Sequence, residues 1–393
     1  MLPRSLVSTD KQPDHEVVAA DNTTRTYVMQ GSPRTRALDI YHLIFAPTHA
    51  CNLRCKHCYL PDHVNELIPK ATALRLLDEW SEIVLQERGL YGGIFHVKGG
   101  EPFVISYIWD MIDRLTHLQS LQLMLTTNGT FTGEKVFKKL SRCNEALDGH
   151  ATIVVSLDGA TEDTHAILRG KGHFAKTLLF LKGIRASGIT LHLNCVLHKG
   201  NLHELAAYIE LAKGFGASQV NFLAFVPRGI GLGFREFQLP HIEVYRHLDG
   251  LYKSGDEETK ALLAGSLSHI KKRESAGEYQ TSHECVAAYR GMFYITPEGN
   301  VNTCPNIVFP EFSLGNVLRN TLKEICEKLP KLHERLGRYA DHYACSGEKI
   351  LYEKQADRVN QESLLILSKE LRSRSNNDAG EGKALSYCFS RNY

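Results

Sequence analysis

Three cysteines with metal-ligand spacing are the residues of this chain most suited to chemistry. They lie in the run Cys51-Asn-Leu-Arg-Cys55-Lys-His-Cys58. Thiolates are soft ligands that bind iron–sulfur clusters or zinc. A structural zinc site needs four ligands, whereas a four-iron cluster held by three thiolates keeps one iron open, so the spacing favours such a cluster. A structural zinc site completed by His57 is the alternative.

Glycines and small polar residues follow several apolar runs further along the chain. The segments are Lys98-Gly99-Gly100-Glu101-Pro102, Thr126-Thr127-Asn128-Gly129 and Ser156-Leu157-Asp158-Gly159. Glycines let the backbone approach a ligand closely, and small polar side chains offer hydrogen-bond partners to hydroxyls and carboxylates. For Asn128 and Asp158, a role limited to a turn or a helix cap is the alternative.

Six short β-rich runs alternate with helix-like segments and must position these motifs. The clearest helix-like segment carries Leu74, Leu77 and Trp80 on one stripe and ends at Gly89, a typical C-terminal residue. This alternation predicts an α/β fold with a parallel sheet and right-handed crossovers. Ligands bind such sheets at the carboxyl ends of the strands, where the motifs above lie. The predicted strands are 41–45, 94–98, 121–126, 152–157, 191–197 and 219–225.

Two neighbouring residues of the fifth predicted strand have different expected surroundings. Cys195 shares one face with leucines, whereas Asn194 lies on the opposite face. We therefore expect Asn194 to face the inner side of the sheet, near a bound cofactor. Cys195 is expected to pack as a small buried apolar residue, and Cys326, at an apolar helical position, is interpreted in the same way. Cys143 has no cysteine neighbour and receives no role.

The patterns divide the chain into four predicted parts. Residues 1–38 are polar and predict a flexible N-terminal arm, and residues 39–240 form the α/β core. Charged, helix-like sequence at 241–280 predicts a helical linker, and 281–393 form a C-terminal domain. That domain contains a hairpin pattern, with strand-like runs at 292–296 and 301–304 around a turn.

Composition and charge limit the classes of partner. The 393 residues include 46 Lys and Arg against 44 Asp and Glu, and this net charge of +2 gives no argument for nucleic acid or an anionic membrane. No apolar run reaches the roughly 18 residues of a membrane span, and the N-terminus lacks a signal-peptide core. We therefore expect a cytoplasmic protein, in which ten cysteines indicate metal ligation or thiol chemistry.

The cysteine loop and the strand-end motifs resemble the radical S-adenosylmethionine (SAM) superfamily. The resemblance implies a partial (β/α)6 TIM-like barrel and a [4Fe-4S] cluster bound by Cys51, Cys55 and Cys58. In that family the open iron chelates SAM, and an electron from the cluster cleaves SAM to give a 5′-deoxyadenosyl radical that abstracts hydrogen from the substrate. An external electron donor such as flavodoxin or ferredoxin is then expected.

The resemblance also implies which residues surround SAM. Arg169 pairs with the SAM carboxylate, for which a planar guanidinium is suited. His57 departs from the family, which usually has an aromatic residue there, but its planar ring can still lie near the adenine. The expected SAM-binding residues are His57, Gly99, Gly100, Glu101, Asn128, Ser156, Asp158, Arg169 and Asn194.

The C-terminal cysteines resemble the opening of a SPASM/twitch domain, an extension that carries auxiliary iron–sulfur clusters. Cys285, Gly299 and Cys304 match its C-x13-G-x4-C spacing, and the segments 314–317 and 322–328 also fit. The dense cysteine run of a complete SPASM domain is missing. One auxiliary cluster is therefore expected. Its predicted ligands are Cys285, Cys304, Cys345 and Cys388.

Proteins with such extensions mostly modify peptides. The resemblance therefore implies a maturase that cross-links side chains of a ribosomally made precursor peptide, with a cyclophane between an aromatic ring and a β-carbon as the specific expectation. Sulfatase-maturase-like oxidation is disfavoured, because Pro305, which cannot accept a proton, stands where that subgroup has an aspartate base. A radical SAM dehydrogenase of a small molecule is the other alternative. The sequence identifies no catalytic base.

Overall fold

A nine-stranded sheet organises the part of the chain that the computed structural model describes, residues 41–60, 63, 66–274 and 292–337. Its strand order is β6-β5-β4-β3-β2-β1-β7-β8-β9, and strands β1 to β6 pair in parallel, each with the next. These six strands agree with the predicted runs to within one residue at each end, which confirms the predicted α/β fold. They are β1 (His42–Phe45), β2 (Gly93–Val97), β3 (Leu121–Thr127), β4 (Ala151–Ser156), β5 (Thr190–Leu197) and β6 (Gln219–Ala224).

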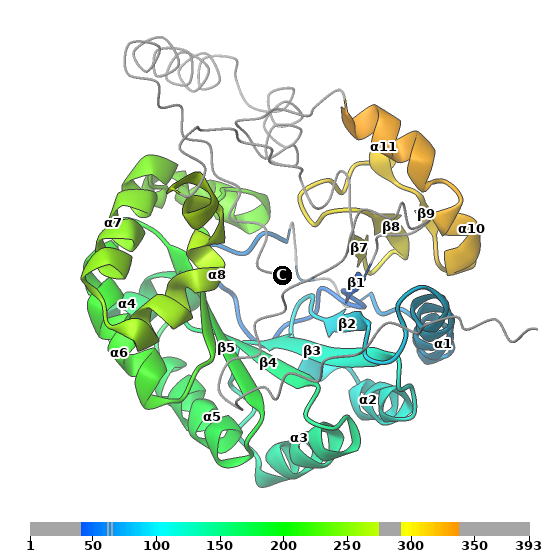
Figure 1. The fold of residues 1–393 in the computed structure, drawn as a ribbon, viewed down its shortest axis with the longest axis horizontal. Coiled ribbons are helices and arrows are strands. Elements are labelled where there is room, and N and C mark those ends of the chain that lie inside the picture. The colour runs from blue at the N-terminus through cyan, green and yellow to red at the C-terminus, as the bar shows by residue number, and fades with distance from the viewer. Residues whose placement is uncertain (1–40, 61–62, 64–65, 275–291, 338–393) are drawn as a thin grey trace, which may run out of the picture. The chain divides into compact units, whose positions relative to one another are not determined.

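Helices between the strands cover the outer side of this curved sheet (Figure 1). Helix α1 (Lys70–Arg88) shows why they pack there, because its buried residues, including Leu77 and Trp80, form one apolar stripe against the sheet. The helix ends at Gly89, which has φ of +81°. The helices are α1 (Lys70–Arg88), α2 (Ile108–Thr116), α3 (Glu134–Ala146), α4 (Glu162–Arg169), α5 (Phe174–Ala186), α6 (Leu205–Gly214), α7 (His241–Ser254) and α8 (Glu257–Glu274). Short 3₁₀ helices lie at Pro102–Val104, Leu202–Glu204, Gly229–Phe237 and Pro310–Phe312.

Helices α7 and α8 occupy the region that the sequence predicts as a helical linker. Helix α8 packs against β6, where the Ser266 hydroxyl donates to Val220 O at 3.0 Å and accepts from Phe222 N–H at 3.1 Å. This segment therefore covers the last parallel strand in addition to connecting two parts of the chain.

The predicted C-terminal hairpin is confirmed, and it is continuous with the sheet. Strands β7 (Met292–Ile295), β8 (Asn300–Asn302) and β9 (Gly315–Asn316) form antiparallel neighbours. Strand β7 also pairs in parallel with β1, with Leu43 opposite Phe293, a contact that the sequence did not predict. Helices α10 (Leu322–Cys326) and α11 (Leu329–Gly337) follow, and Leu322 N–H donates to the Glu79 carboxylate of α1 at 2.8 Å.

The main hydrophobic core lies between the sheet and its helices. Phe45, Phe95 and Trp80 are fully buried there, whereas Ile44 and Tyr294 belong to a smaller cluster on the opposite face of β1 and β7. Alternate residues of β1 thus pack on opposite faces, as strand geometry requires. Among the described helices, none is long and apolar enough to cross a membrane.

Candidate active site

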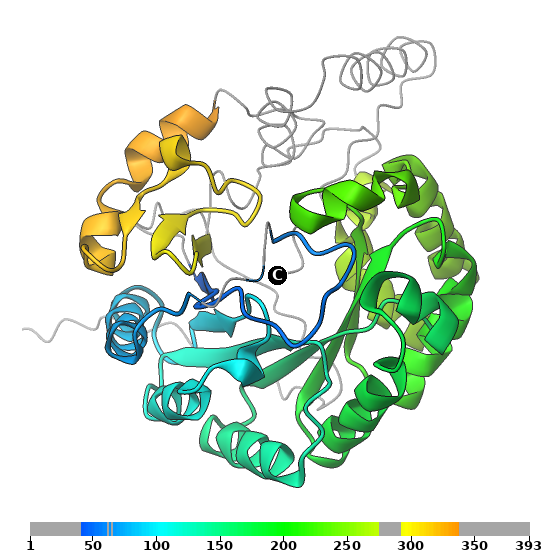
Figure 2. The same ribbon diagram turned by 180° about the vertical axis from the view of Figure 1, so that it is seen from behind.

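The predicted cysteine loop connects β1 to α1 on the inner side of the sheet, where Figure 2 shows it in blue. Backbone hydrogen bonds attach it to two distant segments. Lys56 N–H donates to Leu168 O of α4 at 2.7 Å, and Gly231 N–H, after β6, donates to Cys58 O at 3.0 Å. The loop, which starts at the end of β1, is therefore held against segments that follow β4 and β6.

Gly99 and Gly100 follow β2 and pack directly against the cysteine loop. A Cβ on Gly100 would lie 1.9 Å from the Ala50 carbonyl oxygen, and one on Gly99 would lie 2.6 Å from Thr48 O. Gly99 also has φ of +126°, which residues with a side chain rarely adopt. These glycines therefore let the ends of β1 and β2 approach each other closely, and both also line the cavity described below.

The buried carboxylate of Glu101 is directed toward the end of β3. Its Oε1 accepts from Phe103 N–H at 3.2 Å and from the Thr127 hydroxyl at 2.8 Å, while Oε2 accepts from Asn128 N–H at 2.8 Å. Burial raises the pKa of Glu101 to about 7, although these hydrogen bonds lower it. Glu101 therefore positions Asn128 and Thr127, and it is not among the described residues that line the cavity discussed below.

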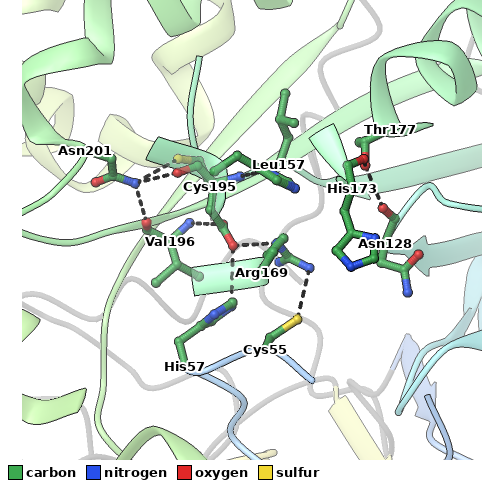
Figure 3. Close-up of polar contacts among 12 residues, drawn as sticks. Cys55, His57, Asn128, Leu157, Arg169, His173, Thr177, Cys195, Val196 and Asn201 are labelled. Carbon is green, nitrogen blue, oxygen red and sulfur yellow. Dashed lines mark hydrogen bonds and ion pairs between the residues drawn. The ribbon is translucent and has the colours of Figure 1, made fainter. Parts of the chain in front are cut away.

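Asp158, which follows β4, is fully buried and is the centre of a polar network, whose members His57, Arg169 and Val196 are labelled in Figure 3. Its Oδ2 accepts from Arg169 Nε at 2.5 Å and lies 3.5 Å from His57 Nε2, and its Oδ1 accepts from Val196 N–H at 2.8 Å. Burial raises the pKa of Asp158, but the charge of Arg169 and the hydrogen bond from Val196 N–H act against it, and that pKa is lowered to about 2. The carboxylate therefore stays ionised and fixes the position of the guanidinium.

The two ring nitrogens of His57 differ, since Nε2 faces Asp158 and Nδ1 has no hydrogen-bond partner in the described part of the chain. Burial lowers the pKa of His57 to about 4, although Asp158 opposes the change, so the imidazole is neutral near pH 7. Its Nε2 faces Asp158 and not the cysteine sulfurs, as expected if it is not a metal ligand. Its Nδ1 is buried and has no hydrogen-bond partner among the described residues, which fits a ligand bound beside it.

Two of the three thiols of the loop have polar neighbours from other parts of the fold. Asn128 Nδ2 lies 3.8 Å from Cys51 Sγ, and Arg169 Nη1 lies 4.0 Å from Cys55 Sγ. Burial raises the pKa of all three thiols, to about 11 for Cys55. They are therefore protonated in the absence of metal, so that ligation releases protons. Three soft thiolates with donors to their sulfurs suit an iron–sulfur cluster.

A cavity of about 220 Å³ lies at the carboxyl ends of the strands and gathers these groups. Asn194, on the cavity wall, accepts a hydrogen bond from Asn221 Nδ2 at 2.8 Å. This bond fixes the Asn194 amide on the inner side of the sheet, as predicted. Among the described residues, no group of three or more His, Cys, Asp or Glu side chains is arranged to hold a single metal ion. Of the predicted residues, the cavity is lined by Cys51, Cys55, His57, Cys58, Gly99, Gly100, Asn128, Ser156, Asp158, Arg169 and Asn194.

Tyr59, Lys98 and Arg228 are among the lining residues that were not assigned from the sequence. Lys98 Nζ lies 5.3 Å and Arg228 Cζ lies 5.1 Å from the centre of the Tyr59 ring. Burial and the charge of Arg228 lower the pKa of Lys98 to about 7, although Cys304 opposes the change. A signal was available, because Lys98 is the last residue of one predicted strand and Arg228 follows the end of another by three residues, in the region where ligands bind.

The C-terminal hairpin contributes the remaining wall of the cavity. Pro305 and Asn306 line it, and Asn306 N–H donates to the sulfur of Cys304 at 3.3 Å. Cys304, a predicted cluster ligand, is 3% exposed. The other predicted ligands of the auxiliary cluster lie outside the described residues: Cys285, Cys345 and Cys388.

The remaining described cysteines are packed in the hydrophobic core. Cys195 and Cys326 are buried there, which confirms their predicted packing role, and Cys143 is buried as well. Burial raises the pKa of Cys143 and of Cys326 to about 12. These thiols are therefore unreactive at ordinary pH.

Two family models match the chain. Residues 45–212 match the radical SAM superfamily, and residues 285–347 match the iron–sulfur cluster-binding domain called SPASM. The first match contains the cysteine loop and strands β2 to β5. The second begins at Cys285 and includes Cys304 and Cys345, whereas Cys388 lies beyond it.

Curated relatives share about a quarter of their residues with this chain. Mycofactocin maturase MftC of Mycolicibacterium smegmatis is 27% identical over 273 residues, a match that spans 69% of this chain and 66% of the relative. The AdoMet-dependent heme synthase of Methanosarcina barkeri is 25% identical over 311 residues, spanning 76% of this chain and 83% of the relative.

Solved structures share the fold at lower identity. SuiB of Streptococcus suis, bound to S-adenosylmethionine, has a TM-score of 0.57 and 14% identity over 74% of this chain and 66% of that chain. The same protein bound to its precursor peptide SuiA has a TM-score of 0.54 and 15% identity over 74% and 65% of the two chains.

Proposed function

We propose that this chain, a radical SAM enzyme with a SPASM domain, modifies a ribosomally made precursor peptide by cross-linking its side chains. The enzyme binds SAM and a [4Fe-4S] cluster, and its SPASM region binds an auxiliary iron–sulfur cluster. A relative named as a mycofactocin maturase and a structural neighbour solved with its precursor peptide support a peptide as the substrate.

One observation carries the proposal: the cysteine loop and the C-terminal hairpin line the same cavity. Cys55 and Cys58 stand on one wall, and Pro305 and Asn306, next to Cys304, stand on another. A substrate held in this cavity is therefore placed between the predicted sites of the two clusters. That arrangement suits an oxidation in which hydrogen is removed on one side and an electron leaves on the other.

The protein's own contribution is to position groups and exclude water. We assign the cluster with the open iron to Cys51, Cys55 and Cys58, and when bound it supplies, with SAM, the radical that abstracts a substrate hydrogen. Arg169 is held in place by Asp158 and lines the cavity, where its remaining donors would bind the carboxylate of SAM. Ser156 and Asn194 offer polar atoms to the rest of SAM.

Within peptide modification, we favour a cyclophane between an aromatic ring and a β-carbon. An auxiliary cluster held by Cys304 would supply an acceptor for the electron that the ring loses, together with a proton to solvent, when it becomes aromatic again, and flavodoxin or ferredoxin would be the external electron donor. Pro305 lines the cavity but has no group that accepts a proton, which disfavours sulfatase-maturase-like oxidation.

Co-expression with candidate peptides tests this function. The chain is produced anaerobically with each short peptide encoded beside its gene, and the peptides are analysed by mass spectrometry. We expect one peptide to lose the mass of two hydrogen atoms and to acquire a link between two side chains. The Cys55→Ala variant is the control, because it should leave the peptide unmodified while the apoprotein stays folded.

A small-molecule substrate is the second candidate, and the heme synthase relative favours it, since that match covers 83% of the relative. The two functions predict different products. If SAM is consumed while every co-expressed peptide keeps its mass, and a small-molecule product accumulates instead, the peptide proposal is wrong.

A further inference from the structure

Arg228 connects the end of β6 to the segment that follows Cys304. Its side chain is largely buried, at 9% exposure, and lines the cavity. One nitrogen, Nη1, donates to Pro305 O at 2.6 Å and to Asn306 Oδ1 at 2.5 Å. Two hydrogen bonds thus hold the guanidinium group against the two residues that follow Cys304, a predicted cluster ligand.

The sulfur of Cys304 is part of the same hydrogen-bonded unit. Asn306 N–H donates to Cys304 Sγ at 3.3 Å, and the side chain of that same Asn306 accepts from Arg228. The guanidinium therefore fixes the residue whose backbone N–H contacts the sulfur. Arg228 and Cys304 are both largely buried, at 9% and 3% exposure, and electrostatic interactions in buried regions are stronger than in water.

Hydrogen bonds to ligating sulfurs and nearby positive charges both favour the reduced, more negative state of an iron–sulfur cluster. A guanidinium keeps its charge in proteins, so its effect does not vary with pH. We propose that Arg228 is a positioning residue that raises the reduction potential of the auxiliary cluster bound through Cys304. This inference does not depend on which substrate the enzyme modifies.

Arg228 is also positioned to act on the auxiliary site more than on the SAM-binding site. Its side-chain hydrogen bonds run to Pro305 and Asn306, whereas its contact beside the cysteine loop is a cation–π contact, 5.1 Å from the centre of the Tyr59 ring. Its charge does lower the pKa of Cys58, but this effect is smaller than those of burial and of Cys51. A variant of Arg228 should therefore change the two clusters unequally.

A redox titration of the reconstituted full-length protein tests the proposal. The auxiliary cluster is followed by electron paramagnetic resonance in the native chain. It is also followed in a variant with Cys51, Cys55 and Cys58 replaced by Ala, which lacks the SAM-binding cluster and therefore shows the auxiliary signal without overlap. For Arg228→Gln we expect at least a tenfold lower ratio of reduced to oxidised auxiliary cluster at a fixed potential, about 59 mV for one electron. Arg228→Lys, which keeps the charge, should shift the ratio less.

Matched controls separate charge from damage to the fold. Arg142, exposed on α3, is replaced by Gln and should leave the potential unchanged. Asn306→Asp is nearly isosteric and adds a carboxylate that neutralises the guanidinium, so it should also lower the potential. If the Arg228→Gln protein loses its auxiliary iron, the reduction potential of the auxiliary cluster in Asn306→Asp tests the proposal in its place.

Two results would overturn the proposal. One is an unchanged potential in iron-replete Arg228→Gln and Asn306→Asp proteins. The other is a full complement of auxiliary iron in Cys304→Ala, which would show that Cys304 is not a ligand. Because no peptide is present in this titration, its failure is distinct from a failure of the proposed function.

Discussion

Replacement of Asp158 by Asn should weaken both the fold and SAM binding. The Asp158 side chain is fully buried and that of Arg169 is 10% exposed, so Asp158→Asn leaves a buried guanidinium without its counter-charge. Loss of one partner of a buried ion pair typically costs about 3–5 kcal/mol. We expect that loss in the free energy of unfolding, measured on the apoprotein by urea denaturation under reducing conditions.

The pH dependence of stability gives a second readout of the same pair. The pKa of Asp158 is about 2 in the folded chain, below its ordinary value of 3.8. The native state therefore binds fewer protons than the unfolded state in this range, and stability falls as the pH falls. The contribution, about 2 kcal/mol, is complete above pH 4 and is lost as the pH approaches 2. Asp158→Asn should lack this acid-dependent loss.

A double variant separates stability from binding. In Asp158→Asn with Arg169→Met, no unpaired charge remains, so at least half of the lost stability should return. SAM affinity, measured by equilibrium dialysis on reconstituted protein, should stay low because the guanidinium is gone. A loss below about 1 kcal/mol in the single variant, or no recovery in the double variant, would refute the reasoning.

Two other substitutions test the cysteine loop. Gly100→Ala places a Cβ 1.9 Å from the Ala50 carbonyl oxygen, so we expect a loss of several kcal/mol in unfolding free energy and poor cluster incorporation. Gly133→Ala, where no atom lies within 4 Å, should change stability by less than about 0.5 kcal/mol. Cys55→Ala should lower the bound iron by the content of one cluster, measured by elemental analysis. Cys143→Ala should keep its iron, and a loss in that variant would contradict the assignment.

The strands were predictable because their signal is local. Alternation of apolar runs with helix-like segments located β1 to β6 to within one residue, and glycine identified the end of α1. The pairing of β7 with β1 was not predictable, because it joins segments far apart in the chain, and β7 is buried on both faces without a distinguishing pattern.

The candidate site was predicted in part for the same reason. Motifs located Cys51 and Asp158, since their spacing and strand-end positions are visible in the chain. The contacts of Glu101 with Thr127 and Asn128 depend on how neighbouring strands pack, so the motif alone could not reveal its positioning role. Arg228 gave only a weak signal, because a single cation in a loop has many possible surroundings.

The pairing of β7 with β1 constrains how this architecture can be recombined. Phe45 lies opposite Ile295, and Ala46 N–H, at the start of the cysteine loop, donates to Ile295 O at 3.0 Å. A single-residue insertion in β7 would exchange its two faces and turn Phe293 toward the inside of the sheet. Chimaeras that graft a C-terminal half from another enzyme should therefore fold only when the graft preserves this alignment.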